Sequence, residues 1–105
     1  MKFTVDKFLE KLPLAANEKW KDGVWDVEPF NDGNVTLVFF APKGNDYQTF
    51  HDEDEFYFIA RGTGTLILDG TAHQFEPGDV FFVPANILHH FQDFSEDFVT
   101  WAVFF

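Results

Sequence analysis

The sequence predicts an all-β protein of antiparallel strands, closed into a barrel or a two-sheet sandwich, with one short helix near the N-terminus. Short apolar segments separated by turn residues run through most of the chain, a pattern typical of strands. About eight such strands in one small domain favour a closed architecture, because closure removes exposed sheet edges. A chain of 105 residues is long enough to form its own core, so we expect a single domain over residues 1–105.

The helix is expected over residues 4–12. Apolar side chains recur there at the spacing of one helix face, and Pro13 ends the pattern. These apolar positions are Val5, Phe8, Leu9 and Leu12. Thr4 or Asp6 can serve as the N-cap. The segment from residue 20 to about residue 30 follows as a turn, a short strand and another turn, with the turns marked by Asp22-Gly23 and Asp32-Gly33.

From residue 34 onward the sequence predicts strands and turns only. The strongest hairpin signal is Asp69-Gly70, which separates two alternating apolar runs. Other turns contain glycine, proline, asparagine or serine, the residue types that favour such bends. The expected strands are 34–41, 55–60, 64–68, 71–76, 79–84, 87–93 and 97–105.

Aromatic residues are abundant, with 16 Phe, 3 Trp and 2 Tyr in the chain. Several strands carry apolar side chains at successive positions, as in residues 80–83 and 99–105. Adjacent residues of a strand face opposite sides, so both faces of these strands are apolar. A small barrel needs only one apolar face per strand. The second apolar face predicts self-association as a homodimer.

The net charge of −11 is concentrated in the second part of the chain. Residues 44–105 contain eleven acidic residues and a single base, Arg61. Such a field repels phosphate backbones, so the sequence predicts no nucleic-acid partner. It is compatible with simple solubility and with attraction of divalent cations, and charge alone does not choose between them. The N-terminus lacks a signal-peptide pattern and no apolar stretch approaches the ~20 residues that span a membrane, which predicts a cytoplasmic protein without membrane association.

Histidines and carboxylates offer the ligands for a metal site, since the chain has no cysteine. His51, Glu55 and Tyr57 have the same strand parity, so they share a face if a short bend keeps His51 in line. His89 and His90 are adjacent and must face opposite ways, so only one of them can meet His51 and Glu55. Two imidazoles and one carboxylate inside a barrel suit iron(II) with open coordination positions.

Two segments of the chain resemble the motifs of the cupin family. Residues 51–64 are similar to the second half of the first cupin motif, in which a histidine, a glutamate and a glycine follow one another at set spacing. Here these are His51, Glu55 and Gly62. Residues 78–89 are similar to the second motif, which contains a glycine-aspartate pair, a proline and a histidine. Here these are Gly78-Asp79, Pro84 and His89.

The resemblance implies the jelly-roll barrel of cupins, an antiparallel double-stranded β-helix, over about residues 34–105. Residues 1–33 then add an N-terminal helix and strand. The resemblance also implies a divalent metal ion inside the barrel, either iron(II), manganese, zinc or nickel. Its ligands would be His51, Glu55 and His89. The other histidine of the first motif corresponds to Thr49, so the fourth ligand stays open.

Tyr57 is the candidate catalytic residue. It lies two positions after Glu55, and similar tyrosines act as an acid or base in some lyase-like cupins; packing is the alternative. Cupins host many activities, so three functions remain open. The first is a metal-dependent enzyme, dioxygenase-like or lyase- or isomerase-like, on a small organic substrate. The second is a non-catalytic module that binds a small metabolite. The third is a metal-free structural or interaction protein, which Thr49 favours.

Overall fold

A computed structural model describes residues 1–46 and 51–105, and within them it contains one helix and eight strands. The helix α1 spans Val5–Leu9. The strands are β1 (Asp26–Asn31), β2 (Thr36–Phe40), β3 (Glu55–Arg61), β4 (Gly64–Leu68), β5 (Thr71–Phe75), β6 (Val80–Val83), β7 (His89–Gln92) and β8 (Val99–Phe104). Each expected strand is found. Five are one or two residues shorter at one or both ends, β4 has the expected bounds, and β3 is one residue longer. The all-β prediction is confirmed.

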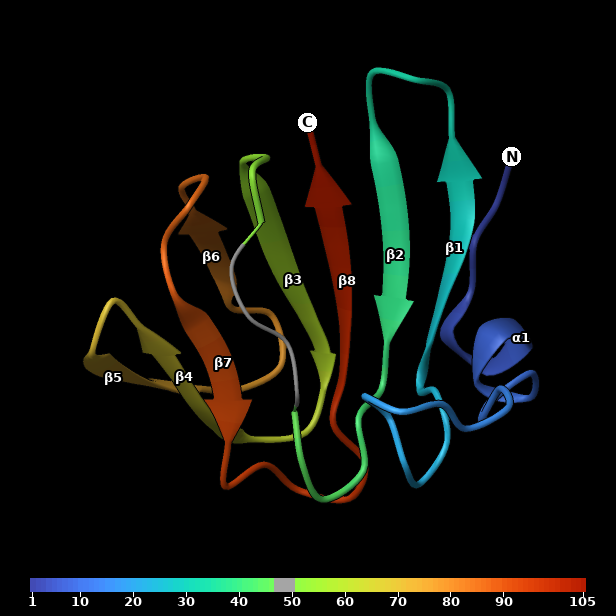
Figure 1. The fold of residues 1–105 in the computed structure, drawn as a ribbon, viewed down its shortest axis with the longest axis horizontal. Helices are drawn as coiled ribbons and strands as arrows, with labels where there is room; N and C mark the ends of the chain where they lie inside the picture. The colour runs from blue at the N-terminus through green and yellow to red at the C-terminus, as the bar shows by residue number, and fades with distance from the viewer. Residues whose placement is uncertain (47–50) are drawn as a thin grey trace.

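The strands form two antiparallel sheets, which together make a jelly-roll barrel (Figure 1). The larger sheet has the order β1-β2-β8-β3-β6, and the smaller has the order β5-β4-β7. The last strand, β8, pairs with both β2 and β3. The predicted hairpin joins β4 to β5, and both of its turn residues have positive φ, 49° at Asp69 and 81° at Gly70. Two positive φ values match the twist of the flanking strands.

Helix α1 is shorter than predicted, and its N-cap is one of the two predicted residues. Thr4 occupies the N-cap position without a side-chain hydrogen bond, and Asp6 lies within the first turn. The N–H groups of Lys11 and Leu12 donate to carbonyls three residues earlier, which tightens the chain and ends the helix. A helix this short depends on packing rather than capping, and its Phe8 is buried. Within the described residues, no helix is long and apolar enough to cross a membrane.

Two apolar clusters hold the fold together. The first fills the space between the sheets; its buried members are Phe40, Tyr57, Ile59, Leu66, Phe75, Val83, Phe91, Phe98 and Ala102. The second lies where α1 packs on the other face of the larger sheet. There the Phe8 ring lies 6.0 Å from that of Phe39 and 6.1 Å from that of Trp101, measured between centroids. Helix α1 therefore covers part of the second apolar face within one chain.

The rest of that second face is open to solvent at the β3–β6 end of the larger sheet. Phe58, Val80, Phe82 and the C-terminal Phe105 are between 41% and 52% exposed. The ring of Phe56 joins them, with centroids 5.2 Å from Phe82 and 5.6 Å from Phe105. We call these five residues the β3–β6 patch.

Replacing Gly62 by alanine is expected to lower the free energy of unfolding by about 3 kcal/mol. Gly62 joins β3 to β4 with φ of 85°, and an added Cβ would lie 2.6 Å from the Cα of Phe98. Left-handed backbone costs a residue with a side chain roughly 1–2 kcal/mol, and the backbone contact adds strain. Gly70→Ala is the matched control, since its φ is 81° with no atom within 4 Å of the new Cβ. Urea unfolding should show the larger loss at Gly62; equal losses would contradict the packing argument.

Candidate metal centre

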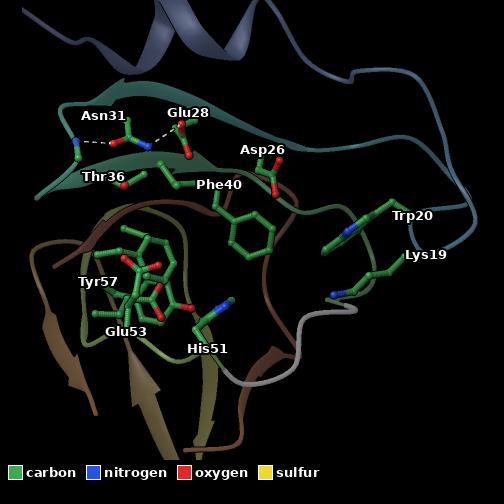
Figure 2. A pocket seen from close by; sticks show the side chains of 15 residues that line it. Lys19, Trp20, Asp26, Glu28, Asn31, Thr36, Phe40, His51, Glu53 and Tyr57 are labelled. Atoms are coloured by element: carbon green, nitrogen blue, oxygen red, sulfur yellow. Dashed lines mark hydrogen bonds between the residues drawn. The ribbon is translucent and has the colours of Figure 1, made fainter. Parts of the chain in front are cut away.

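A cavity of about 570 Å³ lies against the inner face of the larger sheet (Figure 2). Its walls come from β1, β2, β3 and β8 and from the segments that precede β1 and β3. The lining residues are Lys19, Trp20, Asp26, Glu28, Asn31, Gly33, Thr36, Val38, Phe40, His51, Glu53, Glu55, Tyr57, Ala102 and Phe104. This volume is in the range of sites that bind small organic molecules.

The three predicted ligands come together from both sheets, and two of them, His51 and Glu55, also line the cavity. Glu55 begins β3 in the larger sheet, and His89 begins β7 in the smaller sheet. His51 precedes a bend at residues 52–53, which brings it back beside Glu55 as strand parity predicted. The ligand atoms of the three side chains lie within 4.8 Å of one another.

Two hydrogen bonds connect the chain around His51 to the segment that leads into β7. The N–H of Asn86 donates to the carbonyl of His51 at 2.6 Å, and the N–H of Ala85 donates to the carboxylate of Asp54 at 2.9 Å. Asn86 has φ of 64°, a left-handed conformation that asparagine adopts more readily than most residues. These contacts fix the spacing between His51 and the start of β7.

The cluster contains buried polar atoms that lack hydrogen-bond partners. Glu55 and His89 are each 1% exposed. Among the described residues, the buried side-chain atoms without a partner are His51 Nε2, Glu55 Oε1 and His89 Nε2. Glu55 Oε1 and His89 Nε2 lie 3.3 Å apart, which is ion-pair distance when His89 is protonated. An unpaired buried polar atom costs about 1–3 kcal/mol, so these three atoms together are suited to hold a cation or a shared proton.

The Ile87 carbonyl orients the imidazole of His89. His89 Nδ1 lies 2.9 Å from that carbonyl oxygen, which only accepts hydrogen bonds, so Nδ1 carries the proton. The other nitrogen, Nε2, therefore presents its lone pair toward Glu55 in the neutral ring. Burial lowers the pKa of His89, but the Glu55 carboxylate and the Ile87 carbonyl outweigh it and hold the pKa above its ordinary value of 6.5.

His51 has the opposite tendency. Burial lowers its pKa below 6.5, with nearby Glu55 only partly opposing the shift. Its ring lies edge-on to Phe104, with centroids 5.0 Å apart, and 5.2 Å from the ring of His89. His51 is therefore a neutral imidazole near pH 7, the form that coordinates metals.

The ligand set fits a divalent transition metal. Two imidazoles and a carboxylate are the ligands that zinc, iron and manganese accept, and metal–ligand bonds of about 2.1 Å place ligand atoms up to about 4.2 Å apart. The spread of 4.8 Å in the cluster exceeds that limit by about 0.6 Å, a difference that small side-chain rotations remove. The hydrogen bond from His89 Nδ1 to a backbone carbonyl is also typical of metal-bound histidines.

The other residues singled out in the sequence do not all face the cavity. Tyr57 lines the cavity, is 1% exposed, and packs its ring 4.8 Å from that of Phe91 and 6.1 Å from that of His89. His90 faces the other way, with Nε2 3.3 Å from the side-chain oxygen of Gln92. Thr49 lies outside the described residues.

The wall opposite the cluster was not predicted from the sequence. Asp26 and Glu28 lie on β1, and Lys19 and Trp20 lie in the segment before it (Figure 2). The alternation of Asp26 and Glu28 around Val27 is the signal that one polar face of this strand would face a cavity. Nothing local connects these residues with a site that begins at His51, because the pairing of β2 with β8 brings them together.

Comparisons with known proteins agree with this fold. A family model described as "Cupin domain" matches residues 36–104. An uncharacterized protein of Streptomyces coelicolor is 36% identical over 93 residues, which cover 87% of this chain and 88% of that protein. A 5-aminosalicylate 1,2-dioxygenase of Comamonas sp. is 38% identical over 47 residues, which cover 45% of this chain and only 13% of the dioxygenase. The structure of KdgF from Halomonas sp. has a TM-score of 0.65 at 17% identity, covering 75% of this chain and 76% of that one. The chain belongs to the cupin family.

Proposed function

We propose that this protein is a metal-dependent enzyme that acts on a small organic molecule in the cavity. The observation that carries the proposal is the convergence of His51 Nε2, Glu55 Oε1 and His89 Nε2, all buried and without hydrogen-bond partners. These three side chains would hold the ion, which would supply Lewis acidity and, as iron(II), reactivity toward dioxygen. The adjoining 570 Å³ cavity would hold the substrate.

The chain's own residues have distinct roles in this proposal. The Ile87 carbonyl keeps the Nε2 lone pair of His89 directed into the cluster. The Tyr57 hydroxyl would donate a proton to a substrate oxygen or accept one from it, since Tyr57 lines the cavity two residues after Glu55. The walls formed by Phe40 and Phe104 would exclude water from one side of the substrate.

The dioxygenase class is the reaction we favour, because of the partial match to 5-aminosalicylate 1,2-dioxygenase. That match supports the reaction class, but it is too short to identify the substrate. Protein purified without chelator and reconstituted anaerobically with iron(II) should contain stoichiometric metal by elemental analysis. It should then consume dioxygen in an electrode cell when catechols or aminophenols are added. A protein that retains no metal after reconstitution would overturn the proposal.

A metal-free role is the second candidate, and one observation favours it. A protonated His89 paired with Glu55 would satisfy two of the three buried atoms, in keeping with the raised pKa of His89 and the 3.3 Å separation. His51 Nε2 would stay unsatisfied in that arrangement. The metal analysis above separates the two candidates.

We also propose that residues 1–105 act as one cytoplasmic domain and that two copies associate through the β3–β6 patch. The patch consists of exposed apolar side chains at an edge of the larger sheet, and a second copy would bury them around a two-fold axis. This association would account for the apolar face that α1 leaves uncovered.

Light scattering should give about twice the 12.2 kDa chain mass for the wild type. Phe82→Asp places a charge in the centre of the patch and should shift the mass to that of the monomer, with unchanged circular dichroism. Leu14→Asp is the control, since Leu14 is 44% exposed but lies outside the patch. A monomeric wild type at micromolar concentration would rule out this interface.

A further inference from the structure

We propose that the cavity selects small aromatic cations, such as aromatic compounds that carry an alkylammonium group, over aromatic anions. This inference rests on the proposed function, in which the cavity holds the substrate beside the metal cluster. It concerns the opposite wall, formed by β1 and the segment before it. Figure 2 shows Asp26 and Glu28 on that side of the cavity, with His51 and Tyr57 facing them from the other.

The charge of the lining is negative outside the metal cluster. Among the described lining residues other than the candidate ligands, three carry carboxylates, namely Asp26 and Glu28 on β1 and Glu53 beside Glu55, and Lys19 carries an ammonium group. A bound divalent cation would be partly neutralised by Glu55 and would lie at the far end. A ligand ammonium group near β1 would therefore be attracted, and a carboxylate or phosphate repelled.

Glu28 is held in place by a hydrogen-bond chain. The side-chain oxygen of Asn31 accepts the N–H of Gly33 at 2.9 Å, which leaves its amide nitrogen to donate to Glu28 Oε2 at 3.3 Å. The Asn31 amide is thereby fixed in orientation. The remaining lone pairs of the Glu28 carboxylate are available to a donor in the cavity.

Asp26 adds a second carboxylate on the same face of β1. It is half-buried, and burial raises its pKa while the charge of Lys19 opposes the shift. A carboxylate in such surroundings gains from a nearby cation. Lys19 neutralises only part of the negative charge of the carboxylates in the lining. A ligand ammonium group would neutralise more of it.

Aromatic side chains favour a flat ligand body between the two ends. Trp20 and Phe40 line the cavity, with ring centroids 6.1 Å apart in an edge-to-face arrangement. Tyr57 and Phe104 line it beside the cluster. Aromatic rings attract flat aromatic ligands by stacking and cations by cation–π interaction. The rings therefore add to the preference of the cavity for aromatic cations.

Three probes with one skeleton test the inference: dopamine, 4-methylcatechol and 3,4-dihydroxyphenylacetate. They share the catechol ring and differ in whether the far end is cationic, neutral or anionic. Isothermal titration calorimetry is run without oxygen, on the protein alone and with zinc(II), which does not oxidise catechols. Dopamine should bind at least about tenfold tighter than 3,4-dihydroxyphenylacetate, with 4-methylcatechol between them.

The double variant Asp26→Asn/Glu28→Gln should bring dopamine and 3,4-dihydroxyphenylacetate within about threefold of each other and leave 4-methylcatechol nearly unchanged. Glu76→Gln/Glu96→Gln removes the same charge from exposed positions outside the cavity and should keep the wild-type preference. If the double variant folds poorly, Glu28→Gln alone serves in its place, because it changes one exposed residue. It should reduce the dopamine preference by half as much on a logarithmic scale.

Equal affinities of dopamine and 3,4-dihydroxyphenylacetate for the wild type would overturn the inference, as would the absence of binding by all three probes. A preference that also disappears in Glu76→Gln/Glu96→Gln would assign it to the overall charge and overturn the local role of β1. The affinities of the three probes are measured with and without zinc(II). If zinc(II) changes none of them, the metal proposal fails, whatever the preference for dopamine.

Discussion

Alanine in place of His51 or His89 is expected to remove the stabilisation that a divalent cation gives the folded protein. A cation that binds only the native state adds roughly 4 kcal/mol when its free concentration exceeds the dissociation constant a thousandfold. For a domain of this size that corresponds to a rise in melting temperature of roughly 15 °C. Loss of one of three ligands should weaken binding by orders of magnitude, leaving a rise of a few degrees at most. Thermal unfolding with increasing zinc(II) or manganese(II) measures the difference.

His90→Ala is the matched control for His89→Ala. The two histidines are adjacent on β7, but His90 faces away from the cluster and contacts Gln92. Its removal should leave the metal response at the wild-type level. An equal response in His51→Ala, His89→Ala and His90→Ala would show that the cation binds elsewhere, for example on the exposed acidic surface.

Metal affinity is expected to fall steeply as the pH decreases. The pKa of His89 is raised above 6.5, so below that raised value a proton must leave His89 before a cation binds. This should lower the affinity about tenfold per pH unit from near neutrality downward. The pKa of His51 is lowered, so His51 adds a second proton only at pH values below 6.5, where the slope should steepen. Competition titrations with a chromogenic chelator between pH 8 and pH 5.5 measure this profile.

The stability of the metal-free protein should respond to pH in two opposed ways. A raised pKa at His89 stabilises the fold at pH below 6.5, and this contribution is lost as the pH rises through the raised pKa. A lowered pKa at His51 stabilises the fold above pH 6.5, and this contribution is lost as the pH falls through the lowered pKa. His89→Gln should remove the first effect and keep the second. Urea unfolding of both proteins across this pH range measures the two effects. In the metal titrations, an affinity independent of pH would contradict the assignment of His89 as a ligand.

The strands and the candidate ligands were predictable because they follow local rules. Turn chemistry at Asp69-Gly70 and the two-residue period of side-chain direction are properties of adjacent residues. The same period required His51 to share a face with Glu55, and it required His89 and His90 to oppose each other. The cupin motifs then selected His89, and the structure has that residue buried while His90 faces outward.

The expected homodimer shows where a local rule is incomplete. Apolar residues on both faces of β6 and β8 implied a partner, yet Phe8 of α1 covers Trp101 of β8 and Phe39 of the neighbouring β2 within the same chain. Among the described residues of this face, those of the β3–β6 patch stay exposed. The sequence shows that the strands have more apolar surface than one core buries. It does not show how much of that surface helix α1 covers and how much is left for a second copy.

The wall of the cavity depended on contacts between distant parts of the chain. Asp26 and Glu28 lie across the cavity from His51 and Glu55 because β1 pairs with β2, β2 pairs with β8, and β8 pairs with β3. The orientation of His89 likewise depends on a backbone carbonyl, that of Ile87, which no side-chain pattern reveals. Side-chain direction along a strand is set by neighbouring residues, whereas the partners across a cavity are set by sheet order and register. Such long-range pairings gain free energy only when the whole barrel closes.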